Sequence, residues 1–81
     1  MEESVRNLIA THLLDDAGRK VLALTGDEES LVDAGLLDSL GMVQLEEHLR
    51  NELKVELDPL DITIENLESV EKIVELIKSK Q

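Results

Sequence analysis

Leucine, isoleucine and valine recur every three or four residues in three separate stretches of this chain, and we expect no β-strand. Such spacing places apolar side chains on one face of a helix. Four apolar residues form this stripe in the first stretch: Val5, Leu8, Ile9 and Leu13. The stripe ends before Asp15-Asp16-Ala17-Gly18, which predicts an amphipathic helix closed by a turn.

The second stretch predicts a helix from Ser39 to about Leu53, because Leu45, Leu49 and Leu53 recur every four residues. Asp38 or Ser39 is the expected N-cap of this helix.

The third stretch predicts a last helix near the end of the chain. Its apolar stripe has five members: Leu67, Val70, Ile73, Val74 and Ile77. Asn66 or Ser69 stands near its start, and Lys78 and Lys80 stand near its end, where cations suit the helix dipole.

The period is lost between about Gly18 and Asp38, which we interpret as a long structured loop. Five leucines fall in it, too many for all to be exposed, so several should pack under the helices: Leu22, Leu24, Leu31, Leu36 and Leu37. A second loop follows from Val55 to Asp61, and residues 62–65 should form one short helical turn. We therefore expect an all-α, small four-helix bundle with three long helices, one short helix and a long first loop.

The chain of 81 residues is too short to be divided, so residues 1–81 should form a single domain. Aromatic residues are absent, and aliphatic side chains must fill the core. Nineteen acidic residues against eight basic ones give a formal net charge of −11, which makes nucleic acid and anionic membranes poor partners and basic protein surfaces good ones. We expect a monomer that does not insert into membranes.

Cysteine is absent as well, which excludes disulfides, thiolate metal sites and a cysteine nucleophile. The start of the sequence lacks the pattern of a secretion signal, and no apolar run approaches a membrane span, so we expect a cytoplasmic protein.

Ser39 is the candidate for chemistry, because it lies where an irregular loop becomes a helix. Its hydroxyl should be exposed close to the partial positive charge of the helix start, where a phosphate ester would be favoured. A serine at a helix start is most often only an N-cap, so this position by itself decides nothing.

The residues around Ser39 are more informative. The segment Asp33-Ala34-Gly35-Leu36-Leu37-Asp38-Ser39-Leu40-Gly41-Met42-Val43-Gln44-Leu45 resembles the attachment site of the acyl carrier and peptidyl carrier family, with Asp38-Ser39-Leu40 as its central motif. The resemblance implies that a phosphopantetheinyl transferase attaches a covalent phosphopantetheine arm to Ser39. The arm would carry an acyl or aminoacyl cargo as a thioester, supplied by an activating ligase or synthetase and passed to acyl transferases.

Within that family, the segment is more similar to free-standing aminoacyl or specialised acyl carriers, such as D-alanyl carrier proteins, than to fatty-acid carriers. Fatty-acid carriers usually have acidic residues soon after the serine, whereas this chain has Gly41 and Gln44 there. Partners should dock at the start of the serine's helix, on five residues: Leu40, Met42, Val43, Glu46 and Glu47. Met42 suits either a contact patch or the core.

No residue is assigned a catalytic role. His12 and His48 have no neighbouring nucleophile and no metal-ligand spacing in the sequence, and Asp27-Glu28-Glu29 lacks the ligand order of a calcium loop. We therefore expect no metal site and no enzyme activity. The alternative function is an acidic helical adaptor that binds a basic partner without covalent cargo; a small hydrolase would need a base and an oxyanion site near Ser39.

Overall fold

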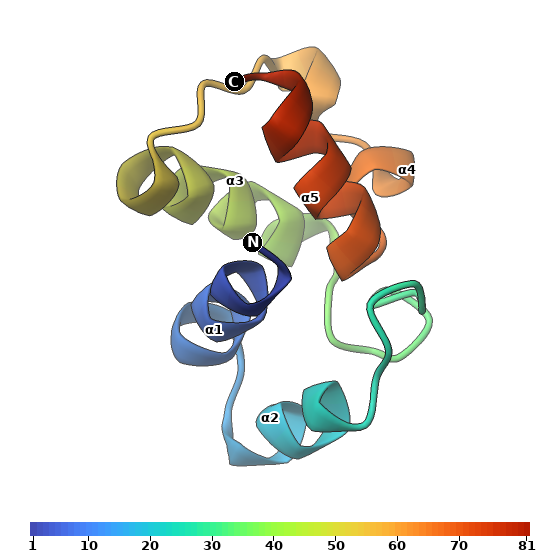
Figure 1. Ribbon diagram of the computed structural model, residues 1–81. Helices are drawn as coiled ribbons and strands as arrows, with labels where there is room; N and C mark the ends of the chain where they lie inside the picture. Colours follow the sequence, from blue (N-terminus) through green and yellow to red (C-terminus); the bar gives the residue numbers. More distant parts are fainter.

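The computed structural model describes residues 1–81 and is built from helices alone (Figure 1). The elements are α1 (Glu2–Leu13), α2 (Asp16–Ala23), α3 (Ser39–Leu53), the 3-10 turn η1 (Pro59–Asp61), α4 (Ile64–Leu67) and α5 (Val70–Ser79). The all-α class and the predicted bounds of the helix that starts at Ser39 are confirmed. None of these helices combines the length and the apolar character needed to cross a membrane.

The bundle forms around α1, which packs against α3, α5 and α2, while α4 packs against α5. Figure 1 shows α2 at the edge of the molecule, away from the chain's C-terminal end. The core is aliphatic, as expected. On α3, Leu45 and Leu49 are fully buried and Leu53 is partly buried, so the predicted leucine stripe is the core face of this helix.

The first loop is shorter than predicted, because α2 occupies Asp16–Ala23. Asp15 begins this helix rather than ending the one before it: its side chain accepts a hydrogen bond from the Gly18 backbone N–H at 2.8 Å. Only Leu22 of α2 is buried, so the helix has no apolar stripe for a periodicity argument to find.

The remaining loop is held against the far end of the chain by backbone hydrogen bonds. The Leu31 N–H donates to the Glu68 carbonyl, and the Glu71 N–H donates to the Asp27 carbonyl at 2.8 Å. Leu31 is fully buried. The loop is therefore structured, as predicted, although the preceding Leu24 is exposed.

Arg6 of α1 joins α2 and this loop to the bundle. Its guanidinium donates to the Leu22 carbonyl at 3.0 Å, to the Thr25 carbonyl and to the Asp27 carboxylate at 2.7 Å. The Leu22 carbonyl, which also accepts from the Thr25 N–H at 3.0 Å, lies in the last turn of α2, and the Thr25 carbonyl lies just after the helix.

The C-terminal part differs from the prediction by a shift of the short helix. Thr63 caps α4 by accepting a hydrogen bond from Asn66 N–H, so the short helix covers Ile64–Leu67 instead of residues 62–65. Ser69 then caps α5 by accepting a bond from Lys72 N–H. Leu67, which fits the stripe of the last helix, therefore belongs to α4.

Candidate functional site

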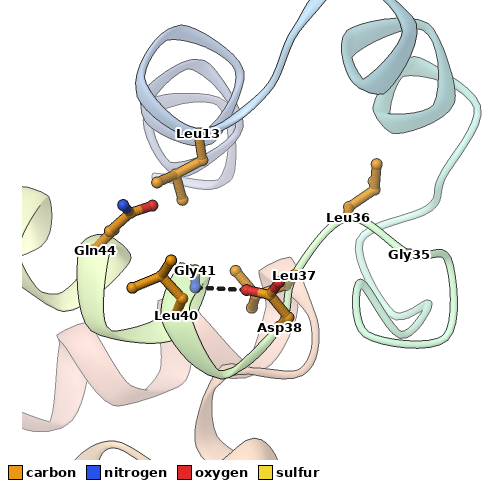
Figure 2. Close-up of a pocket in the computed structure, with 8 residues that line it drawn as sticks. All are labelled: Leu13, Gly35, Leu36, Leu37, Asp38, Leu40, Gly41 and Gln44. Carbon is orange, nitrogen blue, oxygen red and sulfur yellow. Dashed lines mark hydrogen bonds between the residues drawn. The ribbon is translucent and has the colours of Figure 1, made fainter.

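The first turn of α3 is fixed by Asp38, whose backbone is extended and whose side chain caps the helix. The Asp38 carboxylate accepts a hydrogen bond from the Gly41 N–H at 2.7 Å, drawn as the dashed line in Figure 2. The Asp38 carbonyl accepts from the Met42 N–H at 2.8 Å. Of the two expected N-caps, Asp38 is thus the residue that caps α3.

Ser39 is the first residue of α3, and its side chain is exposed. Because Asp38 supplies the capping oxygen, the Ser39 hydroxyl is left out of the capping bond. The Ser39 hydroxyl stands at the N-terminal end of α3, a helix of 15 residues, where the aligned peptide dipoles favour a negatively charged group. This arrangement suits a hydroxyl that becomes a phosphate ester.

The loop before Ser39 turns at Gly35 and is anchored in the core at Leu37. Gly35 has a positive φ of 78°, a conformation that glycine adopts without strain. The Leu37 side chain is then buried in the core immediately before the cap. A Cβ at Gly41 would lie 3.1 Å from Leu37 Cδ1 and 3.2 Å from the Asp38 carboxylate, so glycine lets both pack closely on the first turn.

Two hollows flank the start of α3. Figure 2 shows the first, between the end of α1 and the first turn of α3, where Leu13 faces Leu40 and Gln44. The second hollow includes Ser39 itself, with apolar side chains around it: Val32, Leu37, Met42 and Ile64. Neither hollow was predicted, because each one combines residues from elements that are distant in the sequence.

The predicted partner-contact residues divide between surface and interior. The side chains of Leu40 and Val43 are 66% and 56% exposed, and Glu47 is exposed. Met42 is only 8% exposed, so of the two roles that the sequence allows for it, contact patch or core, the structure shows the core one. The periodicity explains this, since Met42 lies one turn before Leu45 on the core face.

Glu46 is less available than predicted, because its carboxylate pairs with the Arg50 guanidinium at 2.8 Å and its side chain is only 15% exposed.

Two exposed apolar residues that the sequence analysis did not single out are Leu60 of η1 and Ile64 of α4. Ile64 lines the same hollow as Ser39. The sequence holds one signal that could have pointed to Leu60: this apolar residue follows the only proline of the chain and belongs to no helical stripe.

The two histidines do not lie at the start of α3. His12 is at the end of α1, and His48 is nine residues after Ser39 in α3. Their rings stack against each other with centroids 4.1 Å apart. They form a separate cluster with Glu52, which the sequence analysis did not predict.

Comparison with known families shows that the family model described as "Phosphopantetheine attachment site" matches residues 6–77. The matched region contains α2, α3, α4 and most of α1 and α5, together with the whole capped turn at Ser39. Comparisons with curated proteins and with solved structures gave no match.

Proposed function

Because the chain belongs to the phosphopantetheine attachment site family, and so is a carrier protein with a covalent phosphopantetheine cofactor, we propose that Ser39 is the attachment residue. The observation that carries this assignment is the position of Ser39: exposed, first in α3, and relieved of the capping role by Asp38. The cargo we propose is an acyl or aminoacyl group, held as a thioester.

The residues of the chain fit a phosphopantetheine arm at this point. The attachment step transfers phosphopantetheine from coenzyme A. The Ser39 oxygen forms a bond to the phosphorus next to the pantetheine, the pyrophosphate P–O bond on its other side breaks, and adenosine 3′,5′-bisphosphate leaves. A base of the transferase takes the serine proton. The resulting phosphodiester lies at the positive end of α3, which favours its charge. When bound, the arm supplies a thiol that a chain without cysteine cannot provide.

The chain itself acts in this proposal as a rigid base for the arm. Asp38 and Gly41 fix the first turn of α3, and Leu37 anchors the loop before it, so a partner enzyme meets the root of the arm in one orientation. The protein is then a substrate of other enzymes and performs no catalysis of its own. Its partners would be a phosphopantetheinyl transferase, a cargo-activating ligase or synthetase, and downstream acyl transferases.

We assign the docking surface to Leu40 and Val43, with Glu47 supplying charge at its rim. Both apolar side chains are more than half exposed within two turns of Ser39, so a partner that handles the arm can bury them. Met42 contributes from below, as part of the core that supports this turn. The net charge of −11 raises the rate of encounter with basic enzyme surfaces.

For the cargo, the segment from Gly35 to Leu45 favours an amino acid or a specialised acyl group, through its similarity to D-alanyl and related free-standing carriers. Gly41 and Gln44 near the serine support this choice over a fatty acyl cargo. The adaptor alternative is weaker, since the family match supports a covalently bound group and an adaptor needs none.

The attachment is tested by mass spectrometry of the intact chain after incubation with coenzyme A and a broad-specificity phosphopantetheinyl transferase. We expect the chain to gain the mass of one phosphopantetheine, and fragmentation to locate that mass on Ser39. An unchanged mass, with a second carrier protein modified in the same reaction, would contradict the proposal.

A further inference from the structure

The second cluster of chemical interest lies at the opposite end of α3 from Ser39. His12 of α1 and His48 of α3 stack with their ring planes 13° apart. Both rings turn a nitrogen toward one carboxylate: His12 Nε2 lies 2.5 Å, and His48 Nδ1 lies 3.7 Å, from the same oxygen of Glu52. Two helices therefore bring three donor groups close together.

We propose that His12, His48 and Glu52 form a binding site for a divalent transition-metal ion, with Zn²⁺ as the best fit. Their three ligand atoms lie within 4.8 Å of one another. Around a tetrahedral zinc ion with bonds of about 2.0–2.1 Å, neighbouring donors are about 3.3 Å apart. Reaching that arrangement opens the His12–Glu52 contact and turns the two histidine rings out of their stacked, nearly parallel planes, so that one nitrogen lone pair of each ring points at the ion.

The donor set selects the class of ion. Two imidazole nitrogens and one carboxylate oxygen suit zinc and similar transition metals, whereas Mg²⁺ and Ca²⁺ prefer oxygen ligands alone. Zinc sites with three protein ligands keep a fourth position for water. An open hollow beside His12 and Glu52, lined also by Ser4, Asn7 and Thr11, gives water access to that position.

The surroundings favour a cation and allow it to enter. The side chains of His12 and His48 are each 32% exposed, and that of Glu52 is 46% exposed, so no rearrangement of the core is needed. The net charge of −11 raises the local concentration of cations around the whole domain.

A bound ion would join α1 to α3, since it takes one ligand from α1 and two from α3. Glu52 is thirteen residues after Ser39 in the same helix, a distance of about 20 Å at the rise of an α-helix. The site is therefore separate from arm attachment, and the two proposals stand or fall independently.

The test is a titration of the full chain without its arm with Zn²⁺, followed by calorimetry and by nuclear magnetic resonance of the histidine rings. The arm-free form is needed because the arm's thiol could itself bind zinc. We expect one ion per chain, shifts of the ring signals of both histidines and a rise in melting temperature.

His12→Gln, His48→Gln and Glu52→Gln should each weaken zinc binding at least about tenfold. Glu65→Gln, which removes an exposed carboxylate of α4 outside the site, is the matched control and should bind zinc as the parent does. The ring signals of the unmutated chain give a readout that does not depend on any variant folding. Histidine signals that do not move with Zn²⁺, or zinc binding that survives all three substitutions, would overturn the proposal.

Discussion

The Asp38 carboxylate accepts a hydrogen bond from the Gly41 N–H at 2.7 Å and so closes the first turn of α3 around Ser39. Asp38 carries the capping role that a serine at a helix start usually has. The hydroxyl of Ser39 is thereby free for chemistry, and the residue before it holds the turn in place.

This relationship predicts that Asp38→Ala destabilises the domain by about 0.5–2 kcal/mol, the usual cost of losing an N-cap. The same change should slow arm attachment, because the first turn frays at the point where the transferase acts. Asp38→Asn keeps a capping oxygen, so its free energy of unfolding should lie within a few tenths of a kcal/mol of that of the parent. Urea unfolding of the three chains measures the difference, and equal stability for the alanine variant would show that the cap is not needed.

The burial of Leu49 predicts a large effect from a single core substitution. Leu49→Ala removes a fully buried side chain and should cost about 2–5 kcal/mol, a large share of the roughly 5–10 kcal/mol expected for a domain of this size. Val43→Ala on the exposed face of the same helix should cost no more than about 0.5 kcal/mol. Thermal melts followed by circular dichroism compare the two. Similar losses for both would mean that the buried face has been misassigned.

The bounds of α3 could be predicted because Leu45 and Leu49 are four residues apart on one helix face and follow a capping residue. The existence of α2 could not be predicted, since only its Leu22 is buried and it contains Gly18, a residue typical of turns. The boundary between α4 and α5 was missed for the opposite reason. Leu67 continues the apolar spacing of α5 although the Ser69 cap starts a new helix.

The site was predictable where it depends on neighbours in the chain and unpredictable where it depends on packing. Ser39 follows from its local motif and the helix start, and its exposure in the structure agrees with that reading. For Met42 the sequence allows two roles, because its burial depends on which face of α3 meets the core. The cluster of His12 and His48 forms only when α1 packs against α3, so no spacing within the sequence indicates it.

Leu40→Glu tests the proposed docking surface. The substitution places a charge on an exposed apolar contact, so loading by the transferase at limiting enzyme should slow while helical content stays unchanged. Leu24→Glu is the matched control, because Leu24 is 87% exposed outside this turn. Loading of the parent should also slow as salt rises, through screening of the charge attraction. Equal loading rates for the two variants would place the docking surface elsewhere.

The ion pair between Asp61 and Lys80 predicts a pH dependence of stability. The Lys80 ammonium donates a hydrogen bond to the Asp61 carboxylate at 2.8 Å, and the Asp58 backbone N–H donates another at 2.8 Å. Both lower the pKa of Asp61 below its ordinary value, and the bond to Asp61 raises the pKa of Lys80 above its own.

A lowered carboxyl pKa in the folded state contributes stability above the unfolded pKa of about 3.9, which is lost as the pH falls through the folded pKa. The raised pKa of Lys80 contributes stability below about pH 10.4, which is lost as the pH rises through the folded value. At neutral pH the parent should therefore have a higher melting temperature than Asp61→Asn. The difference between the two melting temperatures should shrink below about pH 4 and again above about pH 10.5. At low pH the other carboxylates are protonated and repel one another less, but this affects parent and variant alike and cancels in the comparison. A gap that stays constant across these ranges would contradict the role of the pair.

The most direct test of the account is the intact mass of Ser39→Ala after incubation with coenzyme A and a phosphopantetheinyl transferase. Since Asp38 caps α3, the substitution should leave the helical content and melting temperature close to those of the parent. Ser4→Ala and Ser30→Ala, which remove hydroxyls elsewhere, should gain the mass of one phosphopantetheine as the parent does. The account predicts no added mass on the folded Ser39→Ala chain; an arm attached to that chain would contradict it.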